Sequence, residues 1–205
     1  GLSERAADVA VEPVAVLGCG LRFPGGADGP ESFWRLLRDG VDTVAEVPAE
    51  RWDADAFYDP DPSVPGRMIT RYGAFVSDVD QFDAKFFNIL PREAHNMDPQ
   101  QRLLLEVAWE ALENAGQPAD RVRGSDTGVF MALGVSGYRA LLKPDPATST
   151  LGVHAGLGNS ASFGAGRLSY VFDFHGPSAM LDTTCSSSLT AVHMACQSLR
   201  AGECS

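Results

Sequence analysis

The chain is organised around the stretch Ala179-Met180-Leu181-Asp182-Thr183-Thr184-Cys185-Ser186-Ser187-Ser188-Leu189. A short apolar run ends there in small polar residues, and an amphipathic pattern begins after the cysteine. Apolar positions then recur at helical spacing, and Gly202 follows as a stop signal. These positions are Leu189, Val192, Cys196 and Leu199. The stretch therefore predicts a strand, a sharp turn and a helix, with Cys185 at or near the helix N-terminus.

Cys185 is a candidate nucleophile because of this context. The start of a helix carries N–H groups without partners and a partial positive charge, which favour thiolate over thiol and bind a developing oxyanion. The N–H of Cys185 is itself a candidate oxyanion donor. The small residues on both sides leave room for a substrate. The alternative interpretation is a cysteine that packs as a small hydrophobe, which we favour for Cys19 and for Cys196.

A thiol nucleophile normally needs a base or a proton shuttle. The chain offers four histidines, and none stands at a position that marks it as a partner of Cys185. They are His95, His154, His175 and His193. We interpret each of them as a surface or packing residue.

Composition narrows the class of protein. The 205 residues carry a net charge of −11, which argues against a nucleic-acid partner because such proteins present a basic face. No apolar run reaches the length that spans a bilayer, and the charged N-terminus is not expected to act as a signal peptide because it lacks an apolar stretch. The four cysteines form no CxxC pair, so we expect a reducing, cytoplasmic compartment. Residues 1–12 are expected to be a linker.

Further along the chain, Val14-Ala15-Val16-Leu17 predicts a buried strand. The glycines that follow suggest a dinucleotide-binding motif, but Phe23 stands where the third glycine belongs and Pro24 breaks the required helix. Residues 41–72 predict a long irregular loop. The acidic segment 77–83 lacks the glycine and distal glutamate of a calcium loop, so its apolar neighbours are expected to anchor the core. These neighbours are Phe75, Val79, Phe82, Phe86 and Phe87.

Helix signals are clearest in three places. Residues 30–40 have proline in the first turn and a closing glycine. The segment 98–116 has Asp98 as N-cap, Pro99 at the first helical position and Gly116 as the stop. Residues 158–170 predict one helix rich in small residues. With a second buried strand at 127–134, the alternation of strands and helices indicates an α/β fold.

Several stretches together resemble the N-terminal half of a β-ketoacyl synthase (ketosynthase) domain of a modular type I polyketide synthase. They cover residues 12–205, and the second and third are the most specific. The matching stretches are Glu12-Pro13-Val14-Ala15-Val16-Leu17-Gly18 with Arg22-Phe23-Pro24-Gly25-Gly26, Met97-Asp98-Pro99-Gln100-Gln101-Arg102-Leu103-Leu104-Leu105-Glu106 after Pro91-Arg92-Glu93-Ala94, and Asp182-Thr183-Thr184-Cys185-Ser186-Ser187-Ser188-Leu189.

The resemblance implies a thiolase-like layered αβαβα fold, of which residues 13–205 would be the N-terminal portion, and a homodimer. The family's nucleophile falls on Cys185. There it would take an acyl chain from an acyl carrier protein and condense it with a decarboxylated malonyl-type extender. No cofactor or metal is expected to bind directly, because the substrates are phosphopantetheine thioesters on the carrier. Other polyketide synthase domains are expected partners.

Two departures from the family pattern bear on activity. Thr184 stands where the family commonly has alanine. The family's two catalytic histidines and a lysine lie in its C-terminal half, and none of the four histidines here matches them. The alternative is therefore a non-catalytic fragment that binds acyl groups or carrier protein without condensation. A cysteine hydrolase is a weaker alternative because no His–Asn or His–Asp partner is visible.

Overall fold

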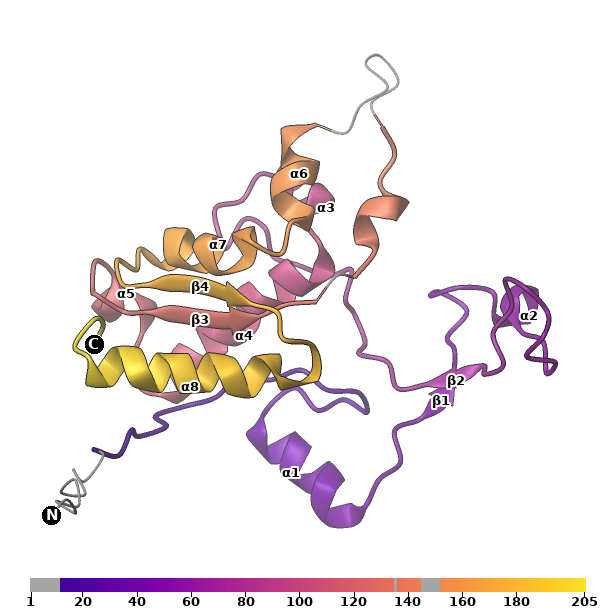
Figure 1. Cartoon of the computed structure of the whole chain (residues 1–205), viewed down its shortest axis with the longest axis horizontal. Helices are drawn as coiled ribbons and strands as arrows, with labels where there is room; N and C mark the ends of the chain where they lie inside the picture. Colours follow the sequence, from indigo (N-terminus) through magenta and orange to yellow (C-terminus); the bar gives the residue numbers. More distant parts are fainter. Residues whose placement is uncertain (1–11, 135, 145–151) are drawn as a thin grey trace, which may run out of the picture.

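The computed structural model describes residues 12–134, 136–144 and 152–205. Its centre is a pair of parallel strands, β3 (Val129–Ala132) and β4 (Ser178–Leu181), in which Ala132 pairs with Leu181. Helix α8 (Ser187–Arg200) covers one face of the pair, and α7 (Phe163–Phe172) covers the other (Figure 1). The predicted α/β arrangement is confirmed for this part of the chain, as three layers with the strands in the middle.

Helix α4 (Pro99–Asn114) packs behind α7 and begins and ends as its sequence predicts. The carboxylate of Asp98 accepts the N–H of Gln100 at 2.9 Å, and Gly116 adopts a left-handed φ of +65°. Both features satisfy backbone groups that a helix end leaves free. The core lies between α4 and α7, where Met97, Leu105 and Phe172 are almost fully buried.

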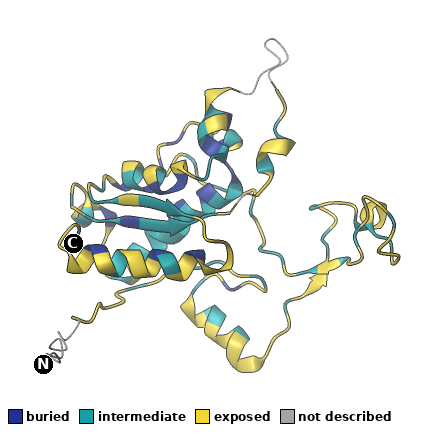
Figure 2. Ribbon diagram, viewed as in Figure 1, coloured by how far each residue is buried: buried dark blue, intermediate teal, exposed yellow. Residues whose placement is uncertain are grey.

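Helix α8 does not bury the face that its apolar periodicity predicts. The residues buried against the strands are Ser187, Ala191 and Ser198, because small side chains allow the helix to approach the short strands closely. Three of the four predicted apolar positions are exposed instead, namely Leu189, Val192 and Leu199, and Cys196 is half-buried. Much of the outer face of α8 is accordingly coloured as exposed (Figure 2). The described part of the chain contains no element that covers this face.

The N-terminal segment corrects one prediction. Val14–Leu17 is neither a strand nor buried, since Val16 is 90% exposed, and no described strand lies beside it to pair with. The glycines that follow have a packing role instead. A Cβ on Gly18 or Gly20 would lie 2.5 Å or 2.1 Å from backbone atoms of α4 or its C-terminal cap, so only glycine allows this close approach.

The predicted irregular region between residues 41 and 72 forms an arm that projects from the body (Figure 1). It starts after α1 (Pro30–Asp39), which ends at the left-handed Gly40 as predicted. The arm contains α2 (Ala54–Phe57) and a two-residue antiparallel ladder between β1 (Ala45–Glu46) and β2 (Tyr72–Gly73). The guanidinium of Arg71 contacts Glu46 and also Asp55 at 2.9 Å, which joins the ladder to α2.

Two further predictions are corrected in the remaining segments. The single helix expected at 158–170 is two helices, α6 (Val153–Asn159) and α7, separated by residues 160–162. The small residues of the segment do not by themselves fix where the chain turns. Phe87 is buried as predicted, but Phe86 is 53% exposed. The other short helices are α3 (Pro91–Asn96), α5 (Ala119–Val122) and two 3-10 turns, η1 (Tyr138–Leu141) and η2 (Thr184–Ser186).

Candidate active site

Cys185 lies in η2, between the end of β4 and the start of α8. This is the strand, turn and helix arrangement that the sequence predicts. The thiol is exposed. Cys185 also stands at the N-terminal end of the fourteen-residue helix α8. There, free N–H groups and the helix dipole favour a bound anion or a developing negative charge.

The turn before Cys185 has an uncommon backbone. Thr184 adopts a φ of +56°, in the left-handed region where β-branched residues are rare. The carboxylate of Asp182 accepts the N–H of Thr184 at 3.1 Å. This conformation reverses the chain direction within a few residues of the strand and places Cys185 at the tip of the helix.

A set of hydroxyl groups surrounds the turn. The Ser187 hydroxyl, which is buried, accepts the N–H of Thr183 at 2.8 Å and donates to the carbonyl of Thr184 at 2.7 Å. The exposed hydroxyls of Thr183 and Ser186 lie 2.9 Å apart, and Thr190 donates to the carbonyl of Ser186 at 3.0 Å. These contacts hold the backbone on both sides of the cysteine.

The four histidines are dispersed over the described structure. His95 is exposed on α3, and His154 lies on α6. His175 contacts Asp173 at 3.2 Å, and His193 is exposed on α8, further along the helix than Cys185. All four and Cys185 are described, and no hydrogen bond joins any of them to the thiol. Their interpretation as surface or packing residues is consistent with these positions.

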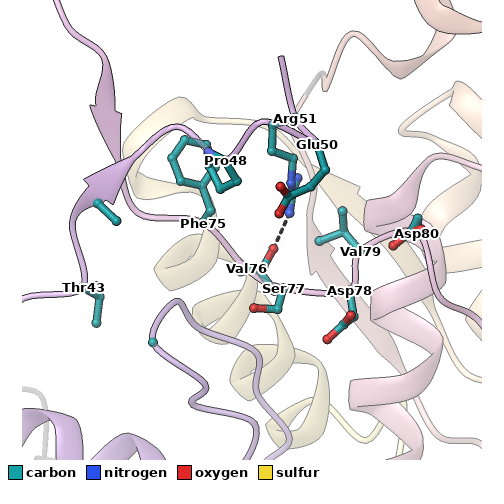
Figure 3. Close-up of a pocket in the computed structure, with 12 residues that line it drawn as sticks. Thr43, Pro48, Glu50, Arg51, Phe75, Val76, Ser77, Asp78, Val79 and Asp80 are labelled. Carbon is teal, nitrogen blue, oxygen red and sulfur yellow. Dashed lines mark hydrogen bonds between the residues drawn. The ribbon is translucent and has the colours of Figure 1, made fainter. Parts of the chain in front are cut away.

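A cavity of about 740 Å³ lies elsewhere, between the arm and residues 75–80 (Figure 3). The Arg51 guanidinium crosses it to donate to the carbonyl of Val76. Carboxylates of Glu50, Asp78 and Asp80 line its wall. The cavity does not include Cys185. Among the described residues, no group of three or more His, Cys, Asp or Glu side chains is arranged to hold a metal ion.

One titratable group on α4 has a shifted pKa. Burial raises the pKa of the Glu106 carboxyl, and the nearby Arg22 opposes that shift. Arg22 itself binds Glu110, with Nη1 donating to Oε2 at 2.6 Å, and this contact raises the pKa of the guanidinium. Together, Arg22, Glu106 and Glu110 form a charged cluster that joins the N-terminal segment to α4. Its role is structural because none of its members contacts the Cys185 turn.

Comparison with known proteins identifies the family of this chain. Residues 11–205 match the family described as β-ketoacyl synthase, N-terminal domain. The chain belongs to the β-ketoacyl synthase family. The resemblance seen in the sequence is thereby confirmed, and the relatives below are polyketide synthases.

Two curated relatives are subunits of the phenolphthiocerol/phthiocerol polyketide synthase of Mycobacterium tuberculosis strain CDC 1551 / Oshkosh. The chain is 56% identical to the first over 192 residues, and this match covers 94% of the chain and 10% of that protein. It is 55% identical to the second over 201 residues, covering 98% of the chain and 13% of that protein. The chain thus spans about a tenth of the length of these relatives.

Solved ketosynthase domains confirm the fold. The oxazolomycin ketosynthase domain of Streptomyces albus JA3453 superposes with a TM-score of 0.81 at 41% identity, covering 92% of the chain and 32% of that domain's chain. A ketosynthase from module 6 of the bacillaene synthase of Bacillus subtilis 168 gives a TM-score of 0.80 at 32% identity, covering 93% and 30%. The fold is thiolase-like, and the chain forms its N-terminal portion.

The sequence pattern identifies Cys185 but does not reveal the hydroxyl that organises the turn. Ser187 looks like one more small polar residue in a run of three serines. The signal that distinguishes it is position: it opens α8 on the face that meets the strands, where Ala191 and Ser198 follow at helical spacing. A serine on a buried helix face needs a hydrogen-bond partner, and the preceding turn supplies it.

Proposed function

We propose that Cys185 is the acyl acceptor of a polyketide ketosynthase. Its thiolate attacks the carbonyl carbon of an acyl thioester, and the phosphopantetheine thiol of an acyl carrier protein leaves. The observation that carries this proposal is the exposed thiol at the tip of α8, on a turn held by its own hydrogen bonds. The N–H groups at that tip would stabilise the tetrahedral oxyanion.

In the second half of the reaction, a malonyl-type extender on a carrier protein loses carbon dioxide. The resulting carbanion attacks the acyl-Cys185 carbonyl, forms a carbon–carbon bond and releases the Cys185 thiolate. None of the four histidines hydrogen-bonds the thiol in the described structure, so we propose that groups from outside the described residues serve this step. We propose that residues 13–205 are the N-terminal portion of the domain, after a linker at 1–12, and that further chain supplies those groups.

The exposed apolar face of α8 supports the proposal that further chain completes the domain. Leu189 and Val192 are 78% and 59% exposed on the helix that follows the nucleophile, although large apolar side chains on such a helix normally pack against another element. The proposed partners are the acyl carrier protein, other polyketide synthase domains and a second copy of the domain. The four cysteines are all free, which fits the proposed cytoplasmic location. No described helix combines the length and apolarity needed to cross a membrane.

A single-turnover acylation experiment tests the first half-reaction. The full chain is incubated with an acyl-N-acetylcysteamine thioester, and the modified peptide is identified by mass spectrometry. Acyl transfer to Cys185, absent in Cys185→Ala, is the expected result. Acylation at Cys19 or Cys204 to the same extent would refute a special role for Cys185.

The second candidate function is a fragment that binds acyl groups or carrier protein without condensation. It is favoured by the lack of a hydrogen bond between Cys185 and any histidine among the described residues. An assay with carrier-bound acyl and malonyl substrates separates the two functions. Release of carbon dioxide with a new β-ketoacyl product from this chain alone would exclude the binding-only function.

A further inference from the structure

The backbone that leads into Cys185 is held in a conformation that its own sequence disfavours. Thr184 is one of four residues other than glycine with a positive φ in the described structure, the others being Asp78, Asn88 and Asp173. Asparagine and aspartate tolerate the left-handed region, whereas a β-branched side chain there clashes with its own backbone. A threonine stays in this region only when its surroundings fix it.

Side-chain hydroxyls hold the turn: those of Thr184 and Ser186 both donate to the carbonyl of Thr183, and only that of Ser187 bonds to both threonines. Ser187 Oγ accepts the N–H of Thr183 at 2.8 Å and donates to the carbonyl of Thr184 at 2.7 Å. The two bonded atoms bracket the φ and ψ angles of both threonines, so a single side chain closes a ring around these four angles. The Thr184 carbonyl also accepts the backbone N–H of Ser187.

The orientation of the Thr184 carbonyl matters for Cys185 because the two share one peptide group. A planar peptide fixes the Cys185 N–H opposite that carbonyl, and hence the direction in which the oxyanion donor points. The carboxylate of Asp182 holds the preceding peptide group through the Thr184 N–H at 3.1 Å. Both peptide groups of Thr184 are thus pinned.

We propose that Ser187 is a positioning residue for Cys185: its buried hydroxyl holds Thr184 in the left-handed conformation that presents the thiol and its N–H at the tip of α8. This inference rests on the proposed role of Cys185 as acyl acceptor. Ser187 itself does not touch the substrate. The neighbouring Ser188 is exposed and makes no side-chain hydrogen bond within the described residues, so it provides a matched control.

The test measures how fast Cys185 of the full chain reacts with iodoacetamide, using Cys19 in the same molecule as the internal standard. Cys19 is exposed and lies on a different segment. Ser187→Ala is expected to lower the Cys185-to-Cys19 rate ratio by about three- to tenfold, the shift in population that loss of one or two hydrogen bonds permits. Ser188→Ala should leave the ratio unchanged, and Ser187→Thr, which keeps the hydroxyl, should largely restore it.

A purely structural role for Ser187 gives a different result. In that case Ser187→Ala lowers the thermal midpoint while the Cys185-to-Cys19 ratio stays at the wild-type value, and this outcome overturns the proposal. If Ser187→Ala does not fold, Asp182→Ala removes a second anchor of the turn, at an exposed position. It is expected to lower the ratio in the same direction, and an unchanged ratio there counts against the proposal.

A double-variant cycle tests whether the hydroxyl acts through Thr184. Glycine adopts the left-handed region without strain, so in a Thr184→Gly background the Ser187 hydroxyl no longer has strain at this position to offset. The effect of Ser187→Ala on the rate ratio should then shrink to less than about twofold. An equal effect in both backgrounds would show that Ser187 does not work by holding Thr184.

These measurements separate the inference from the proposed function. Iodoacetamide needs no substrate recognition, so the ratio reports on the turn even if Cys185 accepts no acyl group. Failure of thioester acylation with a normal response to Ser187→Ala would refute the acyl-acceptor role alone. Normal acylation with no response to Ser187→Ala would refute the positioning role alone.

Discussion

Replacing Gly20 by alanine should detach the N-terminal segment from α4. A Cβ at this position would lie 2.1 Å from the backbone carbonyl oxygen of Val107 and 3.1 Å from the backbone N of Ala111. Both atoms belong to the interior of a capped sixteen-residue helix, which cannot shift by an ångström without breaking its own hydrogen bonds. The segment must therefore move away.

The expected loss in free energy of unfolding follows from the contacts that this movement breaks. Overpacking against rigid neighbours costs about 1–3 kcal/mol. Separation also removes the bond from the Cys19 N–H to Asn114 Oδ1 at 3.0 Å, worth about 1 kcal/mol. It weakens the Arg22–Glu110 pair as well, which adds little because the pair is partly exposed to solvent. We expect Gly20→Ala to lower the free energy of unfolding by about 2–4 kcal/mol.

Urea unfolding monitored by circular dichroism measures this loss. Gly166→Ala is the matched control, because Gly166 is an exposed residue of α7 whose added Cβ would meet no atom within 4 Å. There alanine should raise the stability by up to about 1 kcal/mol through its higher helix propensity. Equal effects of the two substitutions would show that the segment is not packed against α4 as described.

Three further substitutions test the core, the start of α4 and the charge group beside it. Leu105→Ala removes a fully buried side chain and should cost about 2–5 kcal/mol of unfolding free energy, measured by urea unfolding; a loss below that of an exposed Leu37→Ala control would contradict the assigned core. Asp98→Ala removes the α4 cap and the acceptor of the Ser136 hydroxyl and should lower stability by about 1–2 kcal/mol, whereas Asp98→Asn, which still caps, should lose less. Burial raises the folded-state pKa of Glu106, which faces Arg22, Glu110, Arg102 and Asp83. Between its ordinary pKa and the raised value the folded chain holds the extra proton, so stability falls as pH rises through that window. Glu106→Gln should therefore flatten the fall in unfolding midpoint between acidic and neutral pH, and an unchanged pH profile would refute the assignment.

Local signals in the sequence determined the elements whose ends are encoded in single residues. The aspartate, proline and glycine around α4 set its bounds, and Gly40 ended α1, because capping depends on the chemistry of one or two neighbouring positions. The change from an apolar run to small polar residues also located the turn that carries Cys185. The identity of the fold came from motifs that resemble a known family.

Only the tertiary structure decided which partner each apolar segment has. Val14–Leu17 has the pattern of a strand, but a strand needs a neighbour for its backbone hydrogen bonds, and the described chain supplies none. The apolar periodicity of α8 predicts an apolar face, yet the opposite face, which carries small residues, packs against the strands. Small side chains allow the helix to lie close to the strands. The importance of Ser187 likewise depends on the left-handed Thr184: the hydrogen bonds that hold it join residues close in sequence, but only the structure shows that they form.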